Sequence, residues 1–283
     1  MRARAELTVE PGPTGPCMRW SSAPPVVLRP TGPHRVHLVQ AAGGPLGGDD
    51  LGLAVRLGRG VAVQVCSAAA TVVQPGSGAE PARWTVVTDV AEGSMLDWRP
   101  EPTIICDQTH LHSSITVTLR HGARALLREM MVLGRAGQRG GRFHGELTVE
   151  SAGVPLLAHT MLLDGTDPVL AGPAGTGGAR AIGALVVVGE GLGGAPRDAG
   201  EEPGLRWAYS VLDGPGWLLL ALGDTPSAVA RLLDQAALWS ESQSPPSDEQ
   251  LRPAFTATER DHTATEVFLE KNAEITETAG LDS

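Results

Sequence analysis

Short segments in which apolar and polar residues alternate, or in which β-branched residues gather, cover most of the first 240 positions. A period of two residues between Gly, Pro and Asp turns is typical of β-strands. The pattern predicts ten strands of five to nine residues, at 51–57, 61–66, 84–90, 94–98, 115–119, 146–150, 155–163, 181–188, 207–212 and 217–222. The fold is therefore expected to be mainly all-β.

A glycine turn recurs three times in the first half of the chain. The copies centre on Gly60, Gly93 and Gly122, each between the end of one strand and the start of the next, and the glycines are 33 and 29 residues apart. Glycine suits such turns because it adopts positive φ without strain. The repeat indicates a β-helix-like stack of short strands. The alternative is an ordinary β-fold that reuses short glycine turns.

Two segments carry helical signals. Thr225 followed by Pro226 is a typical helix start, and an apolar stripe then continues to about Trp239, so we expect a helix there. Residues 123–133 are good helix formers and precede Gly134, but they come directly after the third glycine turn. The residues alone leave this second segment open between helix and strand.

Composition excludes one fold class and separates the chain into two parts of different charge. The 36 Gly and 22 Pro residues would interrupt long helices often, which excludes a helical bundle. The net charge of −10 is uneven, because residues 241–283 hold ten acidic and three basic residues, a net charge of −7. We therefore predict a β domain at 1–240 and an acidic, flexible tail at 241–283.

Several classes of protein are disfavoured. Without a cluster of basic residues, the chain lacks the usual means of binding nucleic acid. It has no apolar run of about 18 residues and no apolar leader stretch, so we expect a cytoplasmic protein without membrane contact. Cys17, Cys66 and Cys106 lie far apart, against a disulfide scaffold or structural zinc. No hydrolase motif is present, although an unrecognised β-fold enzyme for a small polar substrate stays open.

The first candidate site is the glycine-rich run 43–50, which ends in two acidic residues just before a strand. A nucleotide-binding loop is disfavoured because the run lacks a lysine and leads into a strand rather than a helix. Two interpretations stay open. Gly44, Gly47 and Gly48 could build a tight structural turn, or the turn could present the Asp49 carboxylate to a cation.

The second candidate site is a short cluster that contains Cys106, His110 and His112. On a strand, His110 and His112 would point to the same face, since they are two residues apart. With Cys106 they could bind nickel or zinc, which makes a stand-alone nickel- or zinc-binding protein the alternative function. The competing interpretation is a polar junction between a loop and a strand.

Taken in order, four elements of this sequence resemble the urease accessory protein family UreD/UreH. The first is the Gly-rich run that ends at Asp49, and the second is a strand, Gly60 and another strand that lead into the small-residue stretch 67–71. The third is the acid-Trp-x-Pro element 97–100, and the fourth is Glu129 followed by an apolar run and Gly134-Arg135. Their order and spacing over about residues 35–165 match the family.

The resemblance implies a fold and a role. The fold would be an all-β body with a β-helix-like stack and a few short helices, which makes residues 123–133 a strand. The role would be non-enzymatic: a scaffold for nickel insertion that contacts the urease apoprotein and UreF and, through UreF, the GTPase UreG. Nickel would pass through an internal tunnel, and no cofactor would be tightly bound.

The resemblance also assigns residues. The family's Gly-Gly-Asp carboxylate falls on Asp49, and a second tunnel carboxylate falls on His159, whose neutral imidazole can still ligate nickel. Trp98 is expected in the core, and Glu129 is expected to form an internal ion pair with Arg135. The likeness is expected to end near residue 240.

Overall fold

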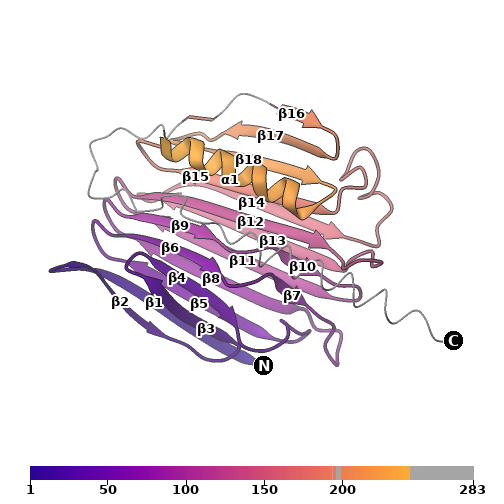
Figure 1. Ribbon diagram of the computed structural model, residues 1–283, viewed down its shortest axis with the longest axis horizontal. Helices are drawn as coiled ribbons and strands as arrows, with labels where there is room; N and C mark the ends of the chain where they lie inside the picture. The colour runs from indigo at the N-terminus through magenta and orange to yellow at the C-terminus, as the bar shows by residue number, and fades with distance from the viewer. Residues whose placement is uncertain (193, 196–198, 243–283) are drawn as a thin grey trace.

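The computed structural model describes residues 1–192, 194–195 and 199–242. In this part of the chain two β-sheets of seven and eleven strands face each other, and a single helix lies outside the larger sheet (Figure 1). The prediction of a mainly all-β fold is confirmed.

The smaller sheet runs from the end of the strand region to the beginning of the chain. Its strands follow the order β14 (Val154–Asp164), β13 (Arg142–Ser151), β11 (His110–Leu119), β8 (Ala82–Val90), β5 (Asp50–Leu57), β1 (Arg2–Gly12) and β2 (Gly15–Ser21). The middle five, from β13 to β1, pair in parallel, and the two outermost pairings are antiparallel.

The larger sheet contains eleven strands. Its main path is β16 (Ala199–Glu202), β17 (Leu205–Val211), β18 (Gly216–Gly223), β15 (Ala181–Val188), β12 (Arg124–Leu133), β9 (Met95–Arg99), β6 (Ala62–Ser67), β4 (Arg35–Gln40) and β3 (Val26–Gly32). Two short strands, β10 (Thr103–Ile105) and β7 (Thr71–Val73), pair with each other, and β10 also pairs with β12.

The centre of the molecule is a stack of coils. From β5 to β12 the chain crosses between the sheets at each glycine turn, and equivalent strands pair in parallel. Gly60, Gly93 and Gly122 have φ values of 65°, 67° and 64°, a region that disfavours side chains. The backbone N–H of Gly60 donates to Glu92 O at 3.1 Å, and that of Gly93 donates to His121 O at 3.3 Å. Successive turns therefore stack on one another, as the repeat predicts.

The core fills the space between the sheets. Along β11 the side chains alternate between partly exposed and buried, because successive strand residues point to opposite faces. The largest fully buried residues of this core come from both sheets and include Leu7, Leu28, Leu51, Leu53, Leu96, Leu119, Leu127 and Leu147.

Helix α1 (Pro226–Ser242) lies across the outer face of the larger sheet, against β12, β15 and β18 (Figure 1). Thr225 Oγ1 accepts a hydrogen bond from Ala228 N at 3.4 Å, as expected of an N-cap. Val229 and Leu233 are fully buried against this sheet. Among the described helices none is long and apolar enough to cross a membrane. The helix ends two residues beyond 240, and residues 243–283 of the predicted tail lie outside the described part.

Each of the ten expected strands is present, with ends shifted by a few residues. The open segment 123–133 is strand β12, because parallel pairing with β9 and antiparallel pairing with β15 outweigh its helix propensity. The four strands in residues 2–40 and the short strands β7, β10 and β16 were not predicted. β1, β4, β7 and β10 pair with strands that are distant in the sequence, whereas β2, β3 and β16 form hairpins with the neighbouring strands β1, β4 and β17.

Candidate functional site: a polar cavity between the sheets

The two sheets enclose a cavity of about 60 Å³, enough for a few water molecules. Its walls combine aromatic and aliphatic side chains with an unusual number of polar ones. The polar or amphipathic residues that line it are Gln40, Ser67, Thr71, Trp84, Trp98, Glu101, Thr103, Ser113 and Glu129.

Glu129 is the most unusual group in this cavity. Its side chain enters from β12, and among the described residues it has no hydrogen bond or ion pair. Burial raises the pKa of this carboxyl from 4.5 to about 7, because a low-dielectric surrounding disfavours the charged form. Arg135 is exposed and bonds the Cys106 thiol instead. The expected ion pair between Glu129 and Arg135 is therefore wrong.

Two further polar groups of the cavity wall have no partner in the described part of the chain. Gln40 Oε1 and Trp98 Nε1 are buried atoms with no hydrogen bond to any described residue. Trp98 is 2% exposed, so its expected place in the core is confirmed. Buried polar atoms in native proteins are almost always bonded to protein, water or an ion. The cavity therefore holds an acceptor, a donor and an acid that have no partner among the described residues and that water or an ion can bond.

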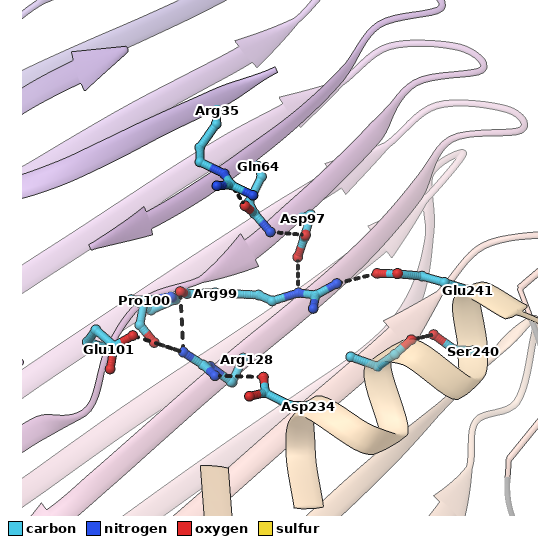
Figure 2. Close-up of polar contacts among 11 residues, drawn as sticks. Arg35, Gln64, Asp97, Arg99, Pro100, Glu101, Arg128, Asp234, Ser240 and Glu241 are labelled. Carbon is cyan, nitrogen blue, oxygen red and sulfur yellow. Dashed lines mark hydrogen bonds and ion pairs between the residues drawn. The ribbon is translucent and has the colours of Figure 1, made fainter. Parts of the chain in front are cut away.

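A chain of polar contacts crosses the outer face of the larger sheet behind the cavity (Figure 2). Arg35 Nε donates to Gln64 Oε1 at 2.7 Å, and Gln64 Nε2 donates to Asp97 Oδ2 at 2.7 Å. Arg99 Nε donates to Asp97 Oδ1 at 2.6 Å, and the other end of its guanidinium is paired with Glu241 at the end of α1. Asp97 is fully buried, so this chain supplies its charge partner.

A second contact connects the helix to the cavity wall. Arg128 Nη1 donates to Asp234 Oδ1 of α1 at 3.1 Å, and its Nη2 donates to Pro100 O at 2.9 Å and lies 3.8 Å from Glu101 Oε1. Pro100 and Glu101 also line the cavity. Arg128 points toward helix α1 (Figure 2). Its neighbour on β12, Glu129, lines the cavity on the opposite face of the strand.

The glycine-rich run forms a compact turn before β5. The Asp49 carboxylate accepts hydrogen bonds from the Met1 amino group at 2.7 Å and from Leu46 N at 3.0 Å. Gly47 packs so closely on the loop at Gly76 that a Cβ would lie 3.0 Å from Gly76 N. Gly44 and Gly48 have positive φ, which favours glycine. Pro45 lines the cavity, whereas Asp49 does not.

His159 lies on the outermost strand β14 and is half-buried. Its Nε2 is a buried atom without a partner in the described part of the chain, and burial lowers the pKa of the ring. The side chain is not part of the cavity lining. The structure thus does not bring His159, Asp49 and Glu129 together.

The structure separates Cys106 from the two histidines of the second candidate cluster. His110 and His112 lie together on β11, with their Nε2 atoms 2.9 Å apart. Cys106 is buried before the strand, where its thiol pairs with Arg135 and burial raises the thiol pKa. Within residues 1–192, 194–195 and 199–242, no group of three or more His, Cys, Asp or Glu side chains is placed to hold a metal ion.

Comparison with known proteins decides the family. The family model described as UreD urease accessory protein matches residues 1–253. The chain is 40% identical over 277 residues to a urease accessory protein UreD of Frankia alni, an alignment that covers 84% of this chain and 92% of the relative. The chain belongs to the UreD family of urease accessory proteins.

Other UreD relatives agree. Urease accessory proteins UreD of a Parafrankia species and of Streptomyces coelicolor are 38% and 40% identical over 263 and 208 residues. These alignments cover 84% and 71% of this chain, and 88% and 80% of the relatives. The UreD family match ends at residue 253, slightly beyond the expected end of the likeness near residue 240.

Sequence reasoning missed part of the site of this UreD protein. Gln40 has no motif around it, and only the meeting of the two sheets brings it to the cavity. The sequence does not indicate the role of Arg128, because its partner Asp234 is 106 residues away. Asp97 and Arg99 were visible in the acid-Trp-x-Pro element, but as part of a motif rather than as a charge pair.

Proposed function

We propose that this UreD family protein is a non-catalytic scaffold in the cytoplasm for nickel insertion into urease. In this role it binds the urease apoprotein and UreF, and through UreF it recruits the GTPase UreG. Support for the maturation role comes from the family match and from relatives that are named urease accessory proteins. The particular partners follow from the resemblance to the family.

We further propose that the cavity is part of a conduit for nickel. The observation that carries this proposal is the carboxyl of Glu129, which has no partner among the described residues and lies in a polar cavity between the sheets. Carboxylate oxygen is an accepted ligand of divalent first-row metals. A divalent cation beside Glu129 favours its charged form and releases its proton. Nickel is cargo in this proposal, and the protein has no tightly bound cofactor.

The resemblance to the family assigns two other residues, His159 and Asp49, to the nickel route, and their surroundings differ. His159 offers a neutral nitrogen whose Nε2 has no partner among the described residues. Asp49 is already bonded by the Met1 amino group and Leu46 N, so it would have to exchange these bonds to contact an ion. We therefore give Glu129 the main role in the passage of nickel.

The scaffold is tested first, because the conduit depends on it. Co-expression with UreF, followed by affinity capture and size exclusion, is expected to give one stoichiometric complex. A well-folded chain by circular dichroism that fails to bind UreF would contradict the scaffold proposal.

Glu129→Gln then tests the conduit. The amide keeps the shape of the side chain but cannot become an anion, so we expect normal assembly with UreF and apo-urease but reduced nickel content of urease. The matched control is Glu146→Gln, since Glu146 is an exposed glutamate on β13 whose side chain is 54% exposed. Normal nickel loading by Glu129→Gln in an intact complex would refute the conduit while leaving the scaffold in place.

A further inference from the structure

The outer face of the smaller sheet carries three neighbouring histidines. His110 and His112 belong to β11, and His144 belongs to β13, where it pairs opposite His112. The residue between the first two, Leu111, is buried and lines the cavity. The histidines therefore lie on the solvent side of the sheet, on the face opposite the cavity.

The first two rings converge. Their Nε2 atoms are 2.9 Å apart, with the ring centroids at 4.4 Å and the ring planes at 79°. At this distance one Nε2–H donates to the lone pair of the other ring. The His144 ring follows, with its centroid 5.2 Å from that of His112. Burial lowers the pKa of both His110 and His112, which favours their neutral forms.

The separation of the two nitrogens matches one type of metal geometry. With metal–nitrogen bonds of about 2.1 Å, neighbouring ligands at right angles lie about 3.0 Å apart, whereas tetrahedral ligands lie about 3.4 Å apart. The observed 2.9 Å fits the right-angled arrangement of square-planar or octahedral ions.

We propose that Nε2 of His110 and Nε2 of His112 form a surface chelate for a square-planar or octahedral divalent ion of the Cu²⁺ or Ni²⁺ type. Water fills the remaining positions, and His144 supplies a third nitrogen after rotation of its side chain. Binding moves the proton of the donating ring from Nε2 to Nδ1, so both Nε2 lone pairs face the ion. Two donors are consistent with the finding that no described group of three is placed to hold a metal.

The surrounding charges permit such a site and limit its strength. Arg142 Nε donates to Asp164 Oδ2 at 2.8 Å, which offsets its positive charge. Glu146 Oε1 lies 3.3 Å from His144 Nε2 and adds a negative charge. Arg83 lies opposite His112 in the sheet register and lowers the pKa of that ring. Its charge also opposes a bound cation, so Arg83→Gln is expected to strengthen binding.

This site is independent of the proposed nickel conduit. The histidines are on the outer face of β11, while Glu129 projects into the cavity. Glu129→Gln is therefore expected to keep the surface site. Loss of nickel loading with an intact surface site would separate the failure of one proposal from that of the other.

The test uses the full-length chain without a histidine tag. Ni²⁺ titration calorimetry measures affinity, and electron paramagnetic resonance of added Cu²⁺ reports nitrogen ligands. We expect His110→Ala/His112→Ala to weaken Ni²⁺ binding about tenfold or more and to remove the Cu²⁺ nitrogen coupling. His121→Ala, which removes an exposed histidine at a turn, is expected to change neither.

Two outcomes would overturn the proposal. One is a wild-type chain that binds neither ion. The other is a double variant that is folded by circular dichroism and retains the wild-type affinity and the nitrogen coupling. In either case the contact between His110 and His112 would be a hydrogen bond of the sheet surface and no more.

Discussion

Glu129 illustrates how much one residue of this protein depends on its surroundings. An unpaired acid in a strand costs free energy when it must ionise away from water, and this side chain lines a cavity with room for only a few water molecules. Its neighbour Arg128 is paired with Asp234 on the other face of the same strand. A shift of β12 by one residue would exchange the acid in the cavity for a guanidinium.

The raised pKa of Glu129 predicts a pH dependence of stability. Between about pH 4.5 and 7 the folded chain retains a proton that the unfolded chain has released. The free energy of unfolding therefore falls as pH rises through this window, by on the order of 3 kcal/mol, and this contribution is constant above it. In Glu129→Gln this contribution is absent.

Urea unfolding at pH 5 and pH 8 measures the effect. We expect Glu129→Gln to match the wild type at pH 5 and to exceed its stability at pH 8, while Glu146→Gln follows the wild type at both. Equal pH dependence in all three proteins would show that Glu129 titrates with an ordinary pKa.

At the scale of elements, the coil turns are the features that the sequence predicted best. Each contains a glycine at a fixed place between two strands, and all three have positive φ. β1 and β4 were missed although their residues alternate; each forms a hairpin with a neighbouring strand and pairs on its other side with a coil strand, β5 or β6, that is more distant in the sequence. The cavity could not be predicted, because its polar residues come from strands of both sheets.

Gly93 tests the turn geometry directly. Its φ is 67°, and a Cβ added there would meet no atom within 4 Å. Gly93→Ala should therefore report only the backbone conformation and cost about 1–2 kcal/mol of unfolding free energy. Gly78→Ala is the control, since its Cβ would also meet nothing but its backbone is outside the positive-φ region. We expect it to change stability by less than about 0.5 kcal/mol. Equal effects in urea unfolding would contradict this account of the turns.

At the scale of the whole molecule, helix α1 connects the end of the described chain to the middle of the larger sheet. Its apolar side covers β15 and β18, and its acidic side chains bond to arginines of β9 and β12. The predicted boundary at residue 240 falls within the last turn of this helix, just before Glu241. The charge pattern located the acidic segment, but it could not reveal that Glu241 pairs with Arg99.

Two truncations distinguish these contributions. A chain that ends at Ser242 keeps α1 and should melt at the same temperature as the full chain, because residues 243–283 hold few apolar side chains. A chain that ends at Ser240 also loses the Glu241 partner of Arg99, whose side chain is only 14% exposed. We expect a loss of about 1 kcal/mol, which corresponds to about 2–4 °C for a domain of this size. Thermal melts that show the larger drop already at Ser242 would contradict this expectation.

The two repeats of the central coil differ in length, and this difference bears on how the size of the cavity is set. The coil steps of 33 and 29 residues differ by four, and so do the return segments 68–81 and 100–109, of 14 and 10 residues, while the glycine turns keep one length. Both returns contribute to the cavity wall, through Thr71 in one and Thr103 in the other. We therefore expect that a longer or shorter return would change the size of the cavity while the coil strands keep their parallel pairing.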